Sequence, residues 1–141
     1  MRATLAGTFP YHRLQSIHET TQSLQYIVAF VVGHAHYKHY PRLKNPINDA
    51  MAIRDVLKNQ NAEVYYAEDC EIDEFEETFG LFLAAVRPRD AVFLYFAGHA
   101  VMLKNDLRLM AISNSSTSAR PDIEANSLKL DLLIARSITT P

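Results

Sequence analysis

The stretch Ala91-Val92-Phe93-Leu94-Tyr95-Phe96-Ala97-Gly98-His99 decides the fold of this 141-residue chain. Its run of apolar residues, mostly aromatic or β-branched, predicts a fully buried strand. Two small residues then end the run and place a histidine at the carboxyl end of the strand. In open α/β sheets, ligands and catalytic groups gather at that end. Because histidine is suited to proton transfer near neutral pH, His99 is a candidate general base.

Working outward toward the N-terminus, a second apolar run over residues 26–32 ends at Gly33 and predicts another buried strand. Asn45 and Pro46 favour the start of a helix, because asparagine is a good N-cap and proline suits the first helical position. Apolar residues then recur at helical spacing until residues 59–61 end the pattern.

A short strand is predicted over residues 62–66, followed by a strongly acidic stretch over residues 68–77. Phe75, Phe79 and Phe82 still form one apolar face of a second helix, which we assign to the core, with the carboxylates on its solvated face. The predicted order is strand, helix, strand, helix, strand. This order implies a parallel sheet with right-handed crossovers and helices on its faces.

The two ends of the chain are less regular. Residues 1–24 are polar and mixed, and we interpret them as an N-terminal extension. After His99, residues 107–112 predict a short strand and the serine-rich residues 113–121 a loop. Ser127 is expected to cap a last helix that continues through Leu128, Leu132 and Leu133.

Composition excludes several classes of protein. The formal net charge is −2, which does not favour binding to nucleic acid or to an anionic membrane. No apolar run approaches the roughly 20 residues that span a bilayer, and the N-terminus lacks the apolar core of a secretory signal. Cys70 is the single cysteine, so no internal disulfide can form, which fits a reducing, cytoplasmic location.

Three histidines, His34, His36 and His39, lie in the predicted loop after Gly33. In an extended loop His34 and His36 would point the same way, and zinc accepts such ligands. No cysteine or spaced carboxylate completes a set, so we interpret the loop as solvated rather than as a metal site. The acidic stretch also lacks the regular spacing of a calcium loop.

Two segments resemble a known family. Asn45-Pro46-Ile47-Asn48-Asp49-Ala50 and Tyr95-Phe96-Ala97-Gly98-His99 are similar to segments of the caspase-like cysteine peptidases, most of all the metacaspase and paracaspase branch. The resemblance runs from about Tyr26 to Ile138. It implies a mainly parallel three-layer α/β/α sandwich with strand order 2-1-3, incomplete at its C-terminal end. Residues 25–141 would then form a partial caspase-like domain.

The resemblance also implies roles for three residues. His99 falls on the catalytic general acid/base, and the backbone N–H of Ala100 on part of the oxyanion hole. The family usually has glycine at that second position, and alanine would resist a positive φ there. Asp49 falls on an acidic residue that lines the pocket for a basic side chain, which implies cleavage after Arg or Lys. A buried carboxylate at the pocket floor can accept two hydrogen bonds from a guanidinium.

The nucleophile does not follow the family pattern. In caspases a cysteine lies roughly 50 residues after the histidine, but none occurs in the 42 residues after His99. Cys70 precedes the histidine, and its acidic neighbours would oppose thiolate formation. We therefore expect a truncated peptidase domain that is inactive alone and needs no cofactor. The resemblance suggests only calcium as an activator, and a peptide or protein as substrate.

Two other functions remain open from the sequence. The first is a catalytically dead, caspase-like interaction module that pairs with itself or with a related subunit, because missing strands would leave an open sheet edge. The second is a flavodoxin-like binder of nucleotide or phosphate. That hypothesis lacks a glycine-rich loop after the first strand, where only Gly33 is present.

Overall fold

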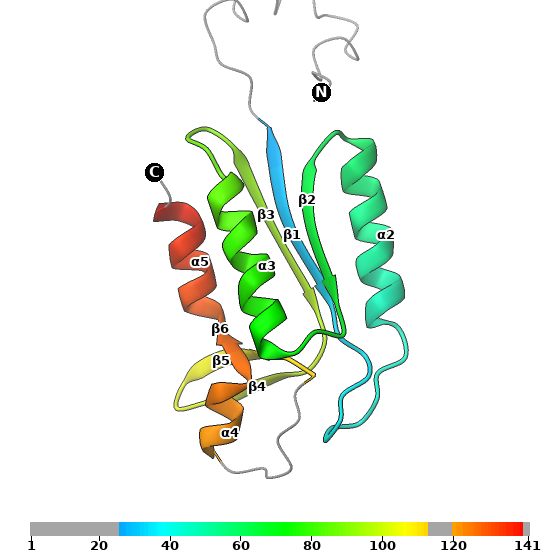
Figure 1. The fold of residues 1–141 in the computed structure, drawn as a ribbon, viewed down its shortest axis with the longest axis vertical. Helices are drawn as coiled ribbons and strands as arrows, with labels where there is room; N and C mark the ends of the chain where they lie inside the picture. The colour runs from blue at the N-terminus through cyan, green and yellow to red at the C-terminus, as the bar shows by residue number, and fades with distance from the viewer. Residues whose placement is uncertain (1–25, 113–119, 140–141) are drawn as a thin grey trace, which may run out of the picture.

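Three parallel strands form the main sheet, β1 (Ile27–Gly33), β2 (Glu63–Glu68) and β3 (Ala91–Ala97). Their order is β2-β1-β3, as the family resemblance implied (Figure 1). Helices α2 (Pro46–Asn59) and α3 (Ile72–Ala85) make the two crossovers between them.

The computed structural model describes residues 26–112 and 120–139. The predicted extension over residues 1–24 and most of the predicted loop over residues 113–121 therefore lie outside the described residues. Among the residues described, no helix combines the length and the apolar character needed to cross a membrane.

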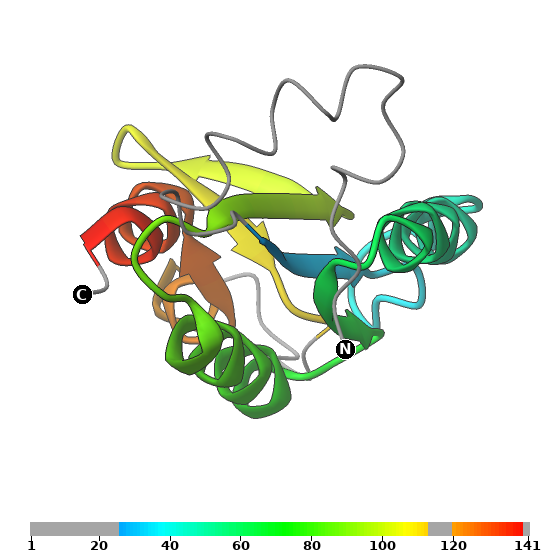
Figure 2. The ribbon, with the colours of Figure 1, turned by 90° about the horizontal axis from the view of Figure 1, so that it is seen from above.

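Strand β1 is the centre of the core, as its apolar run predicted. Val28, Phe30 and Val32 pack against the apolar face of α3, whereas Ala29 and Val31 pack against α2 on the opposite face of the sheet. Seen from above, α2 lies on one side of the sheet and α3 on the other (Figure 2). The side chains of Phe75, Phe79 and Phe82 are buried in this core, which confirms their predicted place.

The predicted start of α2 is confirmed, because Asn45 is the N-cap and Pro46 the first helical residue. The Asn45 side chain makes no capping hydrogen bond, so the proline rather than the cap fixes this start. At the other end, Asn61 has a φ of 59°, a left-handed conformation that asparagine tolerates after a helix.

Strand β3 differs from its prediction. Its side chains are mostly half-buried rather than fully buried, and Phe93 is 38% exposed. Within the described part of the chain β3 pairs only with β1, so its other edge is open. An apolar run identifies a strand but does not show whether a neighbour covers both of its edges.

A second, antiparallel sheet follows, with order β4-β5-β6, and contains β4 (Ala100–Leu103), β5 (Asp106–Met110) and β6 (Ser127–Lys129). Only β5 was predicted, as the short strand over residues 107–112. The turn between β4 and β5 is formed by Lys104 and Asn105, with φ values of 51° and 66°. Two successive positive φ angles make the turn that best fits the twist of a hairpin.

The prediction that Ser127 caps the last helix is wrong. Ser127 lies in β6, and the helix α5 (Leu130–Thr139) begins three residues later. The Ser127 hydroxyl donates to the carbonyl of Ile123 near the end of the short helix α4 (Arg120–Ala125). It accepts a hydrogen bond from Arg108 Nε at 2.7 Å. A serine with two such partners is held in the small sheet and is not available as a cap.

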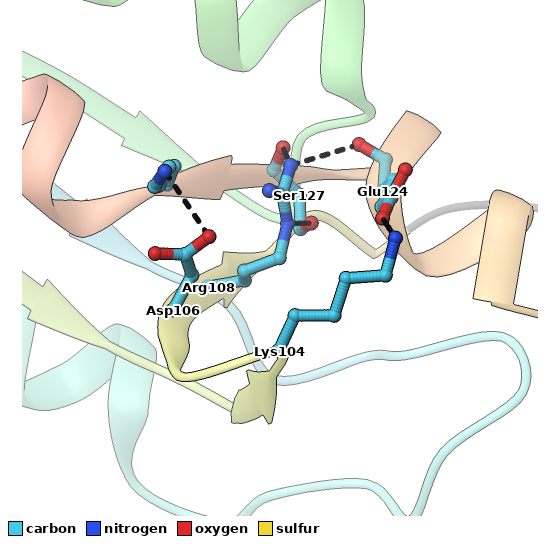
Figure 3. Close-up of polar contacts among 6 residues, drawn as sticks. Lys104, Asp106, Arg108, Glu124 and Ser127 are labelled. Atoms are coloured by element: carbon cyan, nitrogen blue, oxygen red, sulfur yellow. Dashed lines mark hydrogen bonds and ion pairs between the residues drawn. The ribbon is translucent and has the colours of Figure 1, made fainter.

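Charged side chains tie the hairpin to α4 and β6 (Figure 3). The Arg108 guanidinium also donates to the Glu124 carbonyl at 3.1 Å, while Lys104 pairs with the Glu124 carboxylate at 3.5 Å. Lys129 pairs with Asp106 at 3.1 Å. The partners of Arg108 are mostly backbone and hydroxyl oxygens, so this cluster holds the small sheet in place and fixes the end of β5.

Candidate active site

Two histidines follow neighbouring strands at the carboxyl end of the main sheet. Gly33 ends β1 opposite Ala97, which ends β3. His34 comes directly after Gly33, and its N–H donates to the Ala97 carbonyl at 2.8 Å. His99 follows Ala97 by two residues. Both imidazoles therefore lie at the carboxyl end of the parallel sheet, where open α/β sheets bind ligands.

The His99 ring is held in one tautomer. Its Nε2 lies 2.7 Å from the carbonyl oxygen of Pro41, in the loop between β1 and α2. A carbonyl can only accept, so in the neutral ring Nε2 carries the proton and Nδ1 has the free lone pair. Nδ1 has no hydrogen-bond partner among the described residues. The half-buried His99 therefore presents a proton acceptor in a fixed orientation.

Aromatic side chains frame this imidazole. The rings of Tyr37 and Tyr40 lie 4.6 Å and 6.0 Å from it, and the Tyr37 hydroxyl accepts a hydrogen bond from the His99 N–H at 2.8 Å. A Cβ atom at Gly98 would lie 2.5 Å from that hydroxyl. Glycine is therefore required before His99 for this close approach.

Ala100 begins β4 and has none of the positive φ angles found among the described residues. Alanine thus fits where the family usually has glycine. The Met110 N–H donates to the His99 carbonyl at 3.0 Å, so His99 and Met110 form a hydrogen-bonded pair of the ladder. The next pair, Ala100 with Leu109, is then a non-hydrogen-bonded one. In this register the Ala100 N–H is not expected to bond to β5, and its place in an oxyanion hole stays a prediction.

Asp49 lies in the first turn of α2. This end of the helix abuts the end of β1, because a Cβ at Gly33 would lie 2.6 Å from the Pro46 carbonyl. Asp49 therefore lies at the same end of the sheet as His99. Its side chain is exposed, rather than buried at a pocket floor as expected, and makes no hydrogen bond or ion pair with any described residue.

The prediction of a solvated loop is wrong for His34, which is fully buried. Its Nδ1 donates to the carbonyl of Met110 at 2.8 Å, and its Nε2 accepts from the Cys70 thiol at 3.0 Å. Phe75 and Phe96 meet the ring nearly edge-on, at 5.0 Å and 5.6 Å between centroids. The chain thus contains a histidine–cysteine pair, but one sealed inside the core.

Burial keeps this pair neutral. It raises the pKa of Cys70 to about 12, with further contributions from the charges of Glu74 and Asp69. Burial also lowers the pKa of His34, despite its hydrogen bond to a carbonyl. The expectation that Cys70 cannot act as a thiolate rested on its acidic neighbours, whereas desolvation is the larger cause.

His36 lies outside this core and pairs with Asp69. Its Nδ1 is 2.5 Å from one carboxylate oxygen, and the N–H groups of Ala35 and His36 donate to the other. Burial opposes ionisation of Asp69, but these hydrogen bonds outweigh it and lower the pKa of the carboxyl. The pair ties the loop to the end of β2. Among the described residues, no three His, Cys, Asp or Glu side chains are grouped to hold a metal ion.

Sequence reasoning assigned no role to Pro41 or Tyr37. Pro41 acts through its backbone carbonyl, which every residue possesses, so no side-chain signal marks it. Tyr37 belongs to the loop after β1, and its hydroxyl contacts His99 across 62 residues of sequence. Only the small size of Gly98 hints that another group comes close to this turn.

In a comparison with family models, residues 27–132 match the caspase domain of a peptidase family. A comparison with curated proteins gives no significant match. The matched region contains the main sheet, its two crossover helices, the hairpin and most of the remaining described residues. The chain therefore belongs to the caspase domain family.

Proposed function

We propose that this chain supplies the acid/base half of a caspase-like cysteine endopeptidase that cleaves after Arg or Lys. One observation carries the proposal, which is the orientation of the His99 ring at the end of β3. Its Nε2–H is fixed on the Pro41 carbonyl at 2.7 Å, which leaves Nδ1 as the proton acceptor. A general base needs its free nitrogen held in one direction.

The proposed chemistry is that of a cysteine peptidase. His99 takes the proton of an attacking thiol at Nδ1 and later gives it to the leaving amine. The thiolate forms a bond to the carbonyl carbon, and the negative charge that develops on the carbonyl oxygen is stabilised by the Ala100 N–H. In this proposal the thiol comes from sequence outside these 141 residues, because Cys70 is sealed and protonated. The 141 residues alone are then inactive.

Asp49 is proposed to select the basic residue before the scissile bond. Its carboxylate lies at the same end of the sheet as His99. It is exposed and makes no hydrogen bond or ion pair with the described residues. A carboxylate can accept two hydrogen bonds from a guanidinium or one from an ammonium group. Arginine substrates are therefore expected to be cleaved faster than lysine substrates.

The open edge of β3 offers a place for the segment that bears the nucleophile. An apolar hollow of about 360 Å³ lies along this edge and has Gly98 and Ala100, on either side of His99, in its wall. A strand added beside β3 would cover the hollow and end near His99. This placement supports a thiol supplied by an adjoining strand.

The test compares the chain alone with the chain extended by the C-terminal half of a caspase-family peptidase, on peptides with Arg, Lys or Asp before the scissile bond. The extended form should cleave the Arg and Lys peptides, and His99→Ala should abolish cleavage. Asp49→Asn should lower kcat/KM for both basic peptides, while Asp55→Asn, further along the same helix, should not. An inactive extended form, or activity that survives His99→Ala, would overturn the proposal.

Cys70 provides the matched control for the nucleophile. Cys70→Ser keeps a donor to His34 Nε2 and should leave the activity of the extended form intact, because the fully buried thiol is not the nucleophile. In the folded chain, iodoacetamide should leave Cys70 unmodified until denaturant is added. A free, protected thiol also fits the cytoplasmic location that we propose, since thiols stay reduced there.

The open edge also favours a second function, that of a non-catalytic module which binds a related caspase-like subunit. Phe93 on β3 is 38% exposed, and on α5 Leu132 and Ile138 are 54% and 75% exposed. Apolar surface of this kind favours association. Light scattering should then find a dimer or larger assembly, and a monodisperse monomer with no affinity for a caspase-family C-terminal half would contradict it.

A further inference from the structure

The ladder between β4 and β5 has an irregular pair at its end. The Met110 N–H donates to the His99 carbonyl at 3.0 Å. In a regular antiparallel pair the His99 N–H would return this bond to the Met110 carbonyl. Instead it donates to the Tyr37 hydroxyl at 2.8 Å, and that hydroxyl donates to the Met110 carbonyl at 3.2 Å. A side-chain hydroxyl thus stands inside the ladder, next to the candidate catalytic residue.

The Met110 carbonyl has no room for a direct bond from His99. A carbonyl oxygen has two lone pairs, and here one accepts from the Tyr37 hydroxyl and the other from His34 Nδ1 at 2.8 Å. His34 is fixed in turn by the Cys70 thiol at its other nitrogen. The buried His34–Cys70 pair therefore anchors the carbonyl on which the Tyr37 hydroxyl rests.

The environment of Tyr37 suits this bridging position. Its side chain is buried, at 7% exposure, and burial raises the pKa of the hydroxyl well above its ordinary value. The group stays protonated, so it can donate to one backbone group while it accepts from another. The adjacent Lys38 N–H donates to the Ile112 carbonyl at 3.2 Å, which ties this loop to the chain just after β5.

We propose that Tyr37 is a positioning residue for His99. Its hydroxyl holds the His99 backbone away from β5, and this displacement sets the imidazole against the Pro41 carbonyl, with Nδ1 facing outward. The structural part of the inference stands on the contacts above. What the positioned imidazole does in catalysis rests on the proposed function.

The test is nuclear magnetic resonance of the unaltered chain, Tyr37→Phe and Tyr40→Phe. Tyr40→Phe is the control, because Tyr40 is the other tyrosine whose ring lies beside His99. Its hydroxyl makes no hydrogen bond among the described residues. In the unaltered chain, through-hydrogen-bond coupling should join Met110 N to the His99 carbonyl carbon, but not His99 N to the Met110 carbonyl carbon. In Tyr37→Phe the second coupling should appear, because a lone pair of Met110 becomes free.

The imidazole supplies a second readout. At pH 8 the His99 ring of the unaltered chain and of Tyr40→Phe should be in the Nε2–H tautomer, and Tyr37→Phe should convert it to a mixture of tautomers. A coupling between His99 N and the Met110 carbonyl carbon in the unaltered chain would overturn the proposal, whether or not Tyr37→Phe folds. So would an unchanged tautomer in a folded Tyr37→Phe, or the same change in Tyr40→Phe.

These readouts separate this inference from the proposed function, since none of them requires peptidase activity. In the extended, active form, Tyr37→Phe should lower kcat by roughly tenfold or more with KM nearly unchanged, because misplacing a catalytic group weakens the transition state more than binding. If the extended form is inactive but the tautomer change occurs, the proposed function fails and the positioning role stands.

Discussion

His34 and His99 follow neighbouring parallel strands, yet their surroundings give them opposite properties. His34 has a thiol 3.0 Å from its Nε2, a carbonyl on its Nδ1 and no exposed surface. His99 is half-buried, with one nitrogen on the Pro41 carbonyl and the other without a partner among the described residues. The first has the partner that a cysteine peptidase needs but is inaccessible. The second is accessible and lacks the thiol.

Contact between a histidine and a cysteine therefore does not by itself make the cysteine a nucleophile. Desolvation raises the pKa of Cys70 to about 12 and lowers that of His34, so the proton stays on sulfur. Catalysis needs a thiolate that a substrate can reach. The buried pair instead holds the Met110 carbonyl, on which the Tyr37 hydroxyl rests, and that hydroxyl accepts from the backbone N–H of the half-buried His99.

The largest expected difference between the two histidines is in stability. His34→Ala removes a ring packed against Phe75 and Phe96 and deprives the Cys70 thiol of its acceptor, so it should lower the free energy of unfolding by about 2–4 kcal/mol. His99→Ala removes one side-chain hydrogen bond at a partly exposed site and should cost at most about 1 kcal/mol. Urea denaturation measures both, and equal losses would break the comparison.

A smaller effect should appear in the pH dependence of stability. The pKa of His34 is lower in the folded chain than its ordinary value of 6.5. As the pH falls below 6.5, the unfolded chain therefore binds this proton first, and the free energy of unfolding decreases. Asp69, whose pKa is also lowered, contributes only at pH values below its ordinary 3.8.

Urea denaturation of the unaltered chain between pH 7 and pH 5 should show this decrease. His34→Ala should lack the His34 contribution and give a flatter profile, whereas His99→Ala should keep it. If the free energy of unfolding of His34→Ala falls as steeply with pH as that of the unaltered chain, then protonation of His34 is not the cause of the decrease.

Much of the fold was predictable from local patterns. The apolar run of β1, the Asn45-Pro46 start of α2 and the phenylalanine face of α3 each depend on neighbouring residues, and the structure confirms them. The hairpin was harder, because Lys104 gives no sign of a left-handed turn. The sequence predicts Ser127 as a helix cap because it does not show that Arg108 donates a hydrogen bond to the Ser127 hydroxyl.

The site was predictable only in part. The position of His99 after a strand is a local signal, and its catalytic role stays a prediction, while the match to the caspase domain supports the family. The burial of His34 was missed, since its partners Cys70 and Met110 lie 36 and 76 residues away. The Pro41 carbonyl is a backbone group and leaves no trace in the sequence. Tertiary contacts decide these features.

One long-range proton–nitrogen spectrum of the imidazole rings, recorded on the unaltered chain at pH 8, tests the central contrast most directly. In a neutral imidazole this spectrum shows which of the two nitrogens carries the proton. We expect opposite tautomers, with the proton on Nδ1 of His34 and on Nε2 of His99. The same tautomer in both rings, or a mixture at His99, would contradict it.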